Sequence, residues 1–286
     1  MSDQHLLFNY AGQTVALLTQ HGKAQAIAPV LEPALGCRVV TVEGYDTDQL
    51  GTFTREIPRL GTQLEAARRK ARIGMELSGL AVGLASEGSF SADPFSGMFP
   101  WNVELLVWID ERLGIEVMGM AQGPASGGHL LTSDWAAAEA FARREGFPAQ
   151  QLVLRPEHLD HPTLFKGVAS WEDFRARYED CQSLSANGRV WIETDLRAHA
   201  NPSRMRRIGE AATDLLHRLQ SPCPACRSPG FAVTQRIPGL PCAACGAPTG
   251  VYRAESWQCP KCHHTAVVDR TDLTEADAKH CASCNP

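Results

Sequence analysis

Apolar and polar positions follow two different periods along the first 220 residues. Short apolar runs with strand character are separated by longer stretches in which apolar residues recur every three to four positions, as on one face of a helix. We expect strands at 15–18, 38–42, 80–85, 104–109, 115–120, 151–154 and 190–196. We expect helices from about residue 24 to 31 and at 62–77, 134–145, 171–180 and 202–219. Strands that alternate with helices predict an α/β fold with a mixed sheet and flanking helices.

The pattern changes at Ser221-Pro222-Cys223, and we place a domain boundary there. Residues 1–220 are then an α/β domain, and residues 221–286 form a small second domain. Eight of the ten cysteines lie in this second part as four C-x-x-C pairs: Cys223/Cys226, Cys242/Cys245, Cys259/Cys262 and Cys281/Cys284. Two such pairs can hold one tetrahedral zinc ion in a closed structural site, so four pairs predict a ribbon domain with two zinc ions.

The four C-x-x-C pairs can combine into two four-cysteine sites in three ways. We favour one site made of the second and third pairs, because residues 246–258 have the pattern of a short hairpin between them. The first and fourth pairs would then form the enclosing site. A disulfide framework is the alternative, but it needs an oxidising compartment, and residues 1–10 show no export signal. We therefore expect a cytoplasmic protein with reduced, zinc-bound thiols.

Composition excludes some classes of partner. The 286 residues carry a net charge of -5 and contain no apolar run of the length that spans a membrane. From residue 221 onward, six basic residues are nearly matched by five acidic ones. Zinc ribbons that grip nucleic acid are usually basic, so we expect a nucleic-acid partner least. A protein partner at the zinc ribbon, or a homodimer, is compatible with the sequence.

The first stretch with candidate chemistry runs from Thr19 to Lys23, between an expected strand and an expected helix. Gly22 exposes backbone N–H groups at the helix start, Lys23 adds a positive charge, and Thr19 and His21 lie beside them. This arrangement suits an anion such as phosphate. The sequence has neither the G-x-x-x-x-G-K-[ST] loop nor the G-x-G-x-x-G fingerprint, and an ordinary solvated turn is the alternative.

A second candidate stretch, residues 85–90, is expected to be a loop after a buried strand. Glu87 lies here beside Gly88, which leaves room for a ligand, so Glu87 is a candidate metal ligand or general base. Its alternative is a turn cap. Glu65 could supply a second carboxylate, although Thr62-x-x-Glu65 is also the pattern of a helix capping box.

The third candidate stretch is 190–204, where acidic and basic residues alternate toward the end of a strand. Strand alternation puts Glu193, Asp195 and Arg197 on one face, with His199 just beyond. Asn201-Pro202 is explained as the start of the last helix. Basic residues near that helix start either hold phosphate or form a solvated face: Arg197, Arg204 and Arg207.

Several motifs together resemble a known family. The segments LTQHGKAQAIAPVL, LGTFTREIPR, VGLASEGSF and ETDLRAHANPSRM, with the four C-x-x-C pairs, resemble a bacterial family described only as a domain of unknown function. More remotely, the order of the N-terminal motifs resembles the inosine-triphosphate pyrophosphatases and Maf-like nucleotide pyrophosphatases. Residues 19–23 would be their phosphate loop, with His21 in place of an asparagine. Glu65 to Ala71 would be their acidic and basic helix, without its asparagine.

This remote resemblance implies a magnesium-dependent hydrolase of a nucleoside triphosphate or a related phosphorylated nucleotide. Magnesium on Glu87 and Glu65 would activate a water, while Lys23, Lys70 and Arg197 would neutralise phosphate charge. The candidate catalytic residues are Glu87, Glu65 and Asp195. The candidate substrate-binding residues are Thr19, His21, Lys23, Lys70, Ser86, Ser89, Lys166, Arg197, His199 and Arg204. The alternative is a protein that senses a nucleotide without hydrolysis and whose zinc tail docks protein or RNA.

Overall fold

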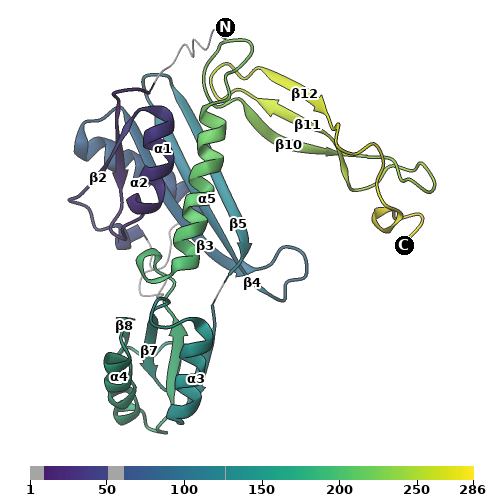
Figure 1. Ribbon diagram of the computed structural model, residues 1–286. Coiled ribbons are helices and arrows are strands. Elements are labelled where there is room, and N and C mark those ends of the chain that lie inside the picture. The colour runs from purple at the N-terminus through teal and green to yellow at the C-terminus, as the bar shows by residue number, and fades with distance from the viewer. Residues whose placement is uncertain (1–9, 51–60, 126) are drawn as a thin grey trace.

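Figure 1 shows the computed structural model of the chain, which describes residues 10–50, 61–125 and 127–286. Residues 1–9, on which the export argument depends, and residues 51–59 of the LGTFTREIPR motif lie outside the described residues. Among the described residues, no helix is both long and apolar enough to cross a membrane.

The described residues form three separate sheets. A five-stranded sheet has the order β2-β1-β3-β4-β5, a four-stranded sheet has the order β6-β9-β7-β8, and a three-stranded sheet has the order β10-β11-β12. In Figure 1 the four-stranded sheet lies below the five-stranded one, and the three-stranded sheet projects from the opposite end.

The five-stranded sheet is mixed. Its strands are β1 (Thr14–Leu18), β2 (Arg38–Val42), β3 (Val82–Ala92), β4 (Pro100–Asp110) and β5 (Ile115–Pro124). β1 pairs in parallel with β2 and β3, whereas β3, β4 and β5 form an antiparallel meander. Parallel neighbours need a crossover, which α1 (Ala24–Leu35) and α2 (Gln63–Ser78) supply. A short 3-10 helix, Thr47–Leu50, follows β2.

Helices cover both faces of this sheet. On one face, α1 and α5 (Pro202–Leu219) pack over a core that includes Leu17, Leu84 and Trp108. On the other face, α2 packs its alanines and Met75 against Ala85 and neighbouring residues of β4. The strands near the middle are therefore buried on both sides, as in three-layer α/β folds.

The four-stranded sheet comes between β5 and α5 in the chain. Its strands are β6 (His129–Thr132), β7 (Leu152–Pro156), β8 (Phe165–Val168) and β9 (Val190–Thr194), all antiparallel to their neighbours. α3 (Trp135–Glu145) and α4 (Trp171–Leu184) cover one face and share a core with Leu154 and Ile192. The sequence pattern predicted α3, β7, α4 and β9 but missed β6 and β8, and it gave no sign that these strands form a sheet of their own.

The C-terminal sheet is a three-stranded antiparallel meander of β10 (Ala232–Pro238), β11 (Tyr252–Gln258) and β12 (Thr265–Asp269). Two short 3-10 helices, Ala198–Ala200 and Ala278–His280, complete the fold. The expectation of a mixed α/β fold followed by a small cysteine-rich sheet is confirmed.

Two local expectations were wrong. Residues 85–90 are not a loop, because β3 continues to Ala92 and pairs with β4 along its whole length. Residues 246–258 are not a hairpin, because Tyr252–Gln258 is one strand that lies between β10 and β12. In both cases neighbouring strands supply the backbone hydrogen bonds that keep the segment extended.

Candidate functional site

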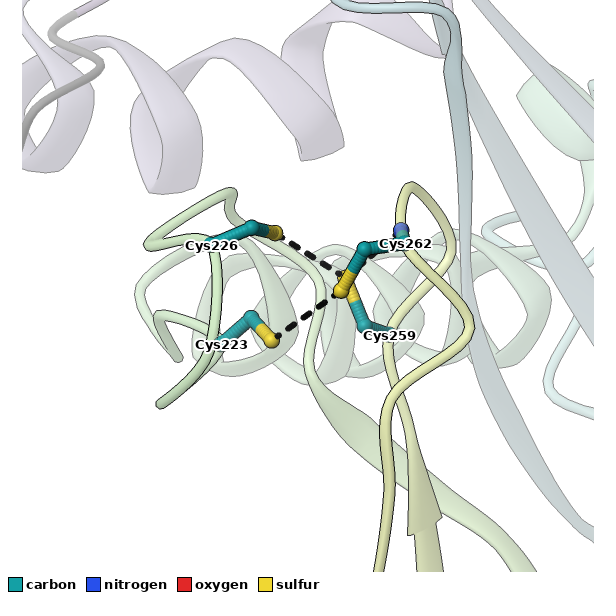
Figure 2. Close-up of side chains that lie close together, drawn as sticks. All are labelled: Cys223, Cys226, Cys259 and Cys262. Atoms are coloured by element: carbon teal, nitrogen blue, oxygen red, sulfur yellow. Dashed lines mark hydrogen bonds between the residues drawn. The ribbon is translucent and has the colours of Figure 1, made fainter.

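The first cysteine cluster lies where α5 leads into the C-terminal sheet. Cys223 and Cys226 come from the loop after α5, and Cys259 and Cys262 come from the turn between β11 and β12, as Figure 2 shows. The Sγ atoms are 3.7 Å apart for Cys223 and Cys262, and 3.6 Å apart for Cys226 and Cys259. Four sulfurs bound tetrahedrally at about 2.3 Å from zinc would be separated by about 3.8 Å, so this cluster fits the ion.

The second cluster has the same form. Cys242 and Cys245 lie in the turn between β10 and β11, and Cys281 and Cys284 lie at the C-terminal end. The Sγ distances are 4.0 Å for Cys242 and Cys284, and 3.7 Å for Cys245 and Cys281. Its four thiols also fit a closed structural zinc site, which leaves no position for water or substrate.

The favoured pairing of the C-x-x-C pairs was wrong. The first pair joins the third and the second joins the fourth. The reason is the meander: the segments before β10 and between β11 and β12 lie at one end of the sheet, and the other two segments lie at the opposite end. The seven residues of β11 separate the two clusters by roughly 20 Å, at about 3.4 Å per residue.

Backbone N–H groups of the C-x-x-C turns donate hydrogen bonds to cysteine sulfurs. The backbone N–H of Ala244 donates to Cys242 Sγ (3.4 Å), and that of Lys261 donates to Cys259 Sγ (3.4 Å). Hydrogen bonds from the backbone of Cys284 and then Ser283 lower the pKa of the Cys281 thiol to about 7. Such bonds favour the thiolate, which is the form that binds zinc.

Apart from the cysteine clusters, a group of buried charged side chains lies around β3. We call it the charge cluster: Lys23, Lys70, Glu87, Glu104 and Arg204. All five residues are at least nine-tenths buried. The cluster has three cations and two carboxylates, so it holds an excess of positive charge when all five are ionised. Buried charges are stable only when they are paired and hydrogen-bonded.

Three members lie on the face of the sheet that α1 and α5 cover. Lys23 Nζ donates to the Ser86 carbonyl oxygen at 2.8 Å, which ties the β1–α1 loop to β3. Arg204 Nε is 2.6 Å from Glu104 Oε1, and both side chains are almost completely buried. A side chain at Gly88 would collide with the Arg204 guanidinium and the Glu104 carboxylate. Gly88 therefore makes room for this ion pair, and not for a ligand as its position suggested.

The other two members lie on the face that α2 covers, because successive residues of a strand point to opposite faces. Lys70 Nζ is 2.5 Å from Glu87 Oε2, and this pair is buried. Gln63 at the start of α2 donates to the Glu87 carbonyl oxygen at 2.7 Å and accepts from Ser89 Oγ at 3.0 Å. The side chains of Glu87 and Ser86 thus leave β3 on different sides.

Glu65 has a capping role in the structure. Its Oε2 accepts from the Thr62 backbone N–H at 2.7 Å, and its own N–H donates to Thr62 Oγ1 at 3.2 Å, which completes a capping box. These hydrogen bonds from Thr62 lower the pKa of the exposed Glu65 carboxyl. Glu87, by contrast, is buried. Among the described residues, the only groups of three or more potential metal ligands are the two cysteine clusters.

Four further candidates surround the charge cluster, and we call them the rim: His21, Asp195, Arg197 and His199. The rings of His21 and His199 stack with centroids 5.1 Å apart, so the β1–α1 loop meets the segment before α5. Arg197 pairs with Asp195, whose nearest oxygen is 2.5 Å away, and Asp195 also accepts from the Gly167 backbone N–H at 3.2 Å. Lys166 precedes Gly167 on β8, so the Lys166 backbone lies near this pair.

Burial and neighbouring cations lower the pKa values of two basic groups at and below the rim. Burial, followed by the charges of Lys23 and His199, lowers the pKa of His21 to about 4. Burial and then the charge of Arg204 lower the pKa of Lys23 to about 7, although Glu87 opposes this shift. An anion at the rim would stabilise the protonated form of both groups.

The structure brings together most of the candidates that are distant in sequence. Lys23, Lys70, Ser86, Glu87 and Arg204 meet around β3, and the four rim residues lie beside them. Thr19 accepts from the His21 backbone N–H at 3.4 Å. The sequence analysis missed Glu104 and Gln63. A signal for Glu104 was available, because strand alternation puts this carboxylate on the same face as the apolar Leu106 and Trp108.

The sheets and the cysteine clusters define the chain as a mixed α/β protein with a C-terminal tail whose two four-cysteine clusters are consistent with two zinc ions. Its sequence matches, over residues 70–286, a family described as a domain of unknown function (DUF6671), and the chain belongs to that family. A search of curated proteins found no match to the chain. The match includes both cysteine clusters, Lys70, the β3 segment and Arg204, whereas Lys23 and His21 precede it.

Proposed function

We propose that the α/β part binds the phosphate groups of a phosphorylated nucleotide at the rim, above Lys23. The observation that carries this proposal is the excess of cations among the buried residues of the charge cluster, beside which burial and then neighbouring cations lower the pKa values of His21 and Lys23. A phosphate between His21 and Arg197 would supply the missing negative charge. The rim also lies beyond the end of β1, where open α/β sheets place ligands.

The remote resemblance to nucleotide pyrophosphatases supports a nucleotide as the bearer of this phosphate. The loop at 19–23 and the basic residues before α5 are far apart in the chain, and the stacked pair of His21 and His199 joins them. The order of motifs that suggested the resemblance is thus accompanied by a contact between the two basic segments. Fold likeness alone does not carry an activity, so binding is the primary proposal.

Hydrolysis is a second candidate function, and Glu87 is the residue that favours it. This buried carboxylate is held at β3 by Lys70. Magnesium commonly uses one or two carboxylates together with substrate phosphates. Because the Glu87 side chain lies on the face that α2 covers, this function requires Glu87 to leave Lys70 and turn toward a triphosphate at the rim. Glu65 has its capping role instead, and we leave it out of this proposal.

A binding titration with inorganic triphosphate and nucleoside triphosphates tests the primary proposal. Lys23→Met keeps the length of the side chain and removes the charge, so it should weaken binding of every triphosphate by at least tenfold. Lys279→Met, on the exposed 3-10 helix of the tail, is the matched control and should change nothing. If wild-type protein binds no triphosphate, or if both variants bind as the wild type does, the proposal fails.

Release of pyrophosphate with magnesium then separates an enzyme from a sensor. If the protein hydrolyses nucleotides, Glu87→Gln should lose roughly a hundredfold in rate, as expected for loss of a positioned acid–base group or metal ligand. Binding without turnover in the wild type would reject hydrolysis and leave the sensor.

We assign the tail a structural role in this proposal, with contact to a protein partner as its further use. Its closed thiolate sites provide no catalytic position. Loss of the second zinc site through Cys242→Ser should therefore leave triphosphate binding unchanged. Reduced binding in this variant would show that the tail takes part in the ligand site.

A further inference from the structure

A cavity of about 460 Å³ lies at the carboxyl ends of the parallel strands β1 and β2. Thr19, Gln20 and Gly22 line it from the β1–α1 loop, and residues 41–45 line it from the end of β2. It therefore shares a wall with the loop that carries His21 and Lys23. Pockets for small molecules typically measure about 300–1,000 Å³, so this volume admits a nucleoside.

Contacts between the walls fix the shape of the cavity. Gln20 Nε2 donates to the Tyr45 carbonyl oxygen at 3.4 Å, and Gln20 Oε1 accepts from Thr47 Oγ1 at 3.1 Å. The half-buried Tyr45 side chain packs against the apolar cluster of Ala16, Leu18 and Val42. The aromatic ring thus lies on a rigid apolar floor, which suits stacking of a planar group.

Glu43 gives the cavity a polarity opposite to that of the rim. A carboxylate repels phosphate but accepts hydrogen bonds from hydroxyl groups, so Glu43 suits a part of the ligand that is rich in hydroxyls. It lies at the end of β2, 20 residues after Lys23. In β-α-β units that carry the G-x-G-x-x-G fingerprint, which this chain lacks, an acidic residue about 20 residues beyond the phosphate loop binds the ribose hydroxyls, and Glu43 has a similar spacing from the 19–23 loop.

We propose that this cavity is the nucleoside subsite, in which Glu43 accepts hydrogen bonds from the ribose hydroxyls and Tyr45 stacks on the base. This inference rests on the proposed function, because it places the phosphates of the same ligand at the rim. It also predicts a preference that the rim alone would not produce: ribonucleotides should bind more tightly than their 2′-deoxy counterparts or inorganic triphosphate.

Calorimetric titration of the full chain tests this inference. The probes are the four ribonucleoside triphosphates, their 2′-deoxy counterparts and inorganic triphosphate. We expect at least one ribonucleotide to bind the wild type tenfold or more tightly than its deoxy counterpart. Glu43→Gln should abolish that preference, and Glu111→Gln, a matched change on the exposed β4–β5 turn, should preserve it.

The stacking role has its own pair of variants. Tyr45→Leu removes the ring and keeps an apolar side chain, so it should weaken nucleotide binding by about tenfold without affecting inorganic triphosphate. Tyr45→Phe keeps the ring and should bind as the wild type does. Unfolding curves of all variants show whether the chain remains folded.

The outcomes distinguish the two proposals. If nucleotides and inorganic triphosphate bind equally well to the wild type, or if the variants weaken all ligands alike, the nucleoside subsite is refuted and the phosphate site stands. If the wild type binds neither nucleotide nor inorganic triphosphate, the proposed function fails and this inference fails with it.

Discussion

The zinc clusters and the charge cluster hold charged groups in opposite ways. Each cysteine cluster takes its residues in pairs from turns of four residues, and the four thiols lie where they can share one zinc ion. The charge cluster takes single residues from the β1–α1 loop, α2, β3, β4 and α5 and has one positive charge in excess when all five residues are ionised. A metal site whose protein ligands are all present is structural. A cluster with an unbalanced positive charge is suited to bind an anion.

Loss of zinc from the C-terminal tail is expected to have the largest effect on stability. Structural zinc contributes an apparent free energy on the order of 10 kcal/mol or more, so loss of an ion should unfold the segment around it. Wild-type protein purified with reduced thiols should contain about two zinc ions per chain by elemental analysis. One ion or none would reject the two-site assignment.

Two double variants test the pairing. Cys223→Ser with Cys259→Ser removes two ligands from one site and should leave about one zinc per chain. Cys223→Ser with Cys242→Ser damages both sites and should leave almost none. The pairing is refuted if the first double variant, Cys223→Ser with Cys259→Ser, also leaves almost no zinc.

The next largest effect concerns the buried ion pair of Arg204 and Glu104. Removal of one partner leaves an uncompensated buried charge, which costs about 3–5 kcal/mol. Arg204→Met should therefore lower the free energy of unfolding by this amount in a urea titration. Arg204→Met combined with Glu104→Leu should recover much of the loss. If the single variant is as stable as the wild type, the pair contributes nothing to the fold.

A smaller effect is the pH dependence of stability that we expect from His21 at the rim. The pKa of His21 is about 4 in the folded chain against 6.5 for the ordinary group. Between these values the unfolded chain binds more protons, so the free energy of unfolding should fall as the pH drops from 6.5 to 4. Each pKa unit corresponds to about 1.4 kcal/mol, and partial exposure of His21 reduces the total to roughly 2 kcal/mol.

Proton NMR titration measures this pKa directly. Saturating inorganic triphosphate should raise the pKa of His21, because the anion stabilises the imidazolium. His21→Asn, which cannot titrate, should flatten the dependence of stability on pH in this window. An unchanged pKa in the presence of triphosphate would place the anion away from the rim.

The smallest effect tests the role of Glu65. Thr62→Ala should cost about 1 kcal/mol of stability, as for other N-caps, and Glu65→Gln should cost less, because glutamine also fits a capping box. Both variants should bind triphosphate as the wild type does. Loss of magnesium-dependent turnover in Glu65→Gln would instead make Glu65 a metal ligand.

Features that depend on near neighbours were predictable from the sequence. The spacing within each C-x-x-C pair identified all eight cysteines of the two clusters, and the periods of apolar residues located most helices and strands. Asn201 was identified as a helix cap, and its side chain accepts from the Arg204 backbone N–H at 3.0 Å. Such features follow from contacts within a few residues, which the sequence shows directly.

Tertiary structure alone decided which distant groups meet. The antiparallel order of β10, β11 and β12 fixed the pairing of the cysteines. Pairing with β4 turned the expected loop at Glu87 into a strand and directed Glu87 to Lys70, while Arg204 found Glu104, 100 residues away. The physical reason is that strand order and register set which side chains share a face, and both depend on hydrogen bonds between segments far apart in the chain.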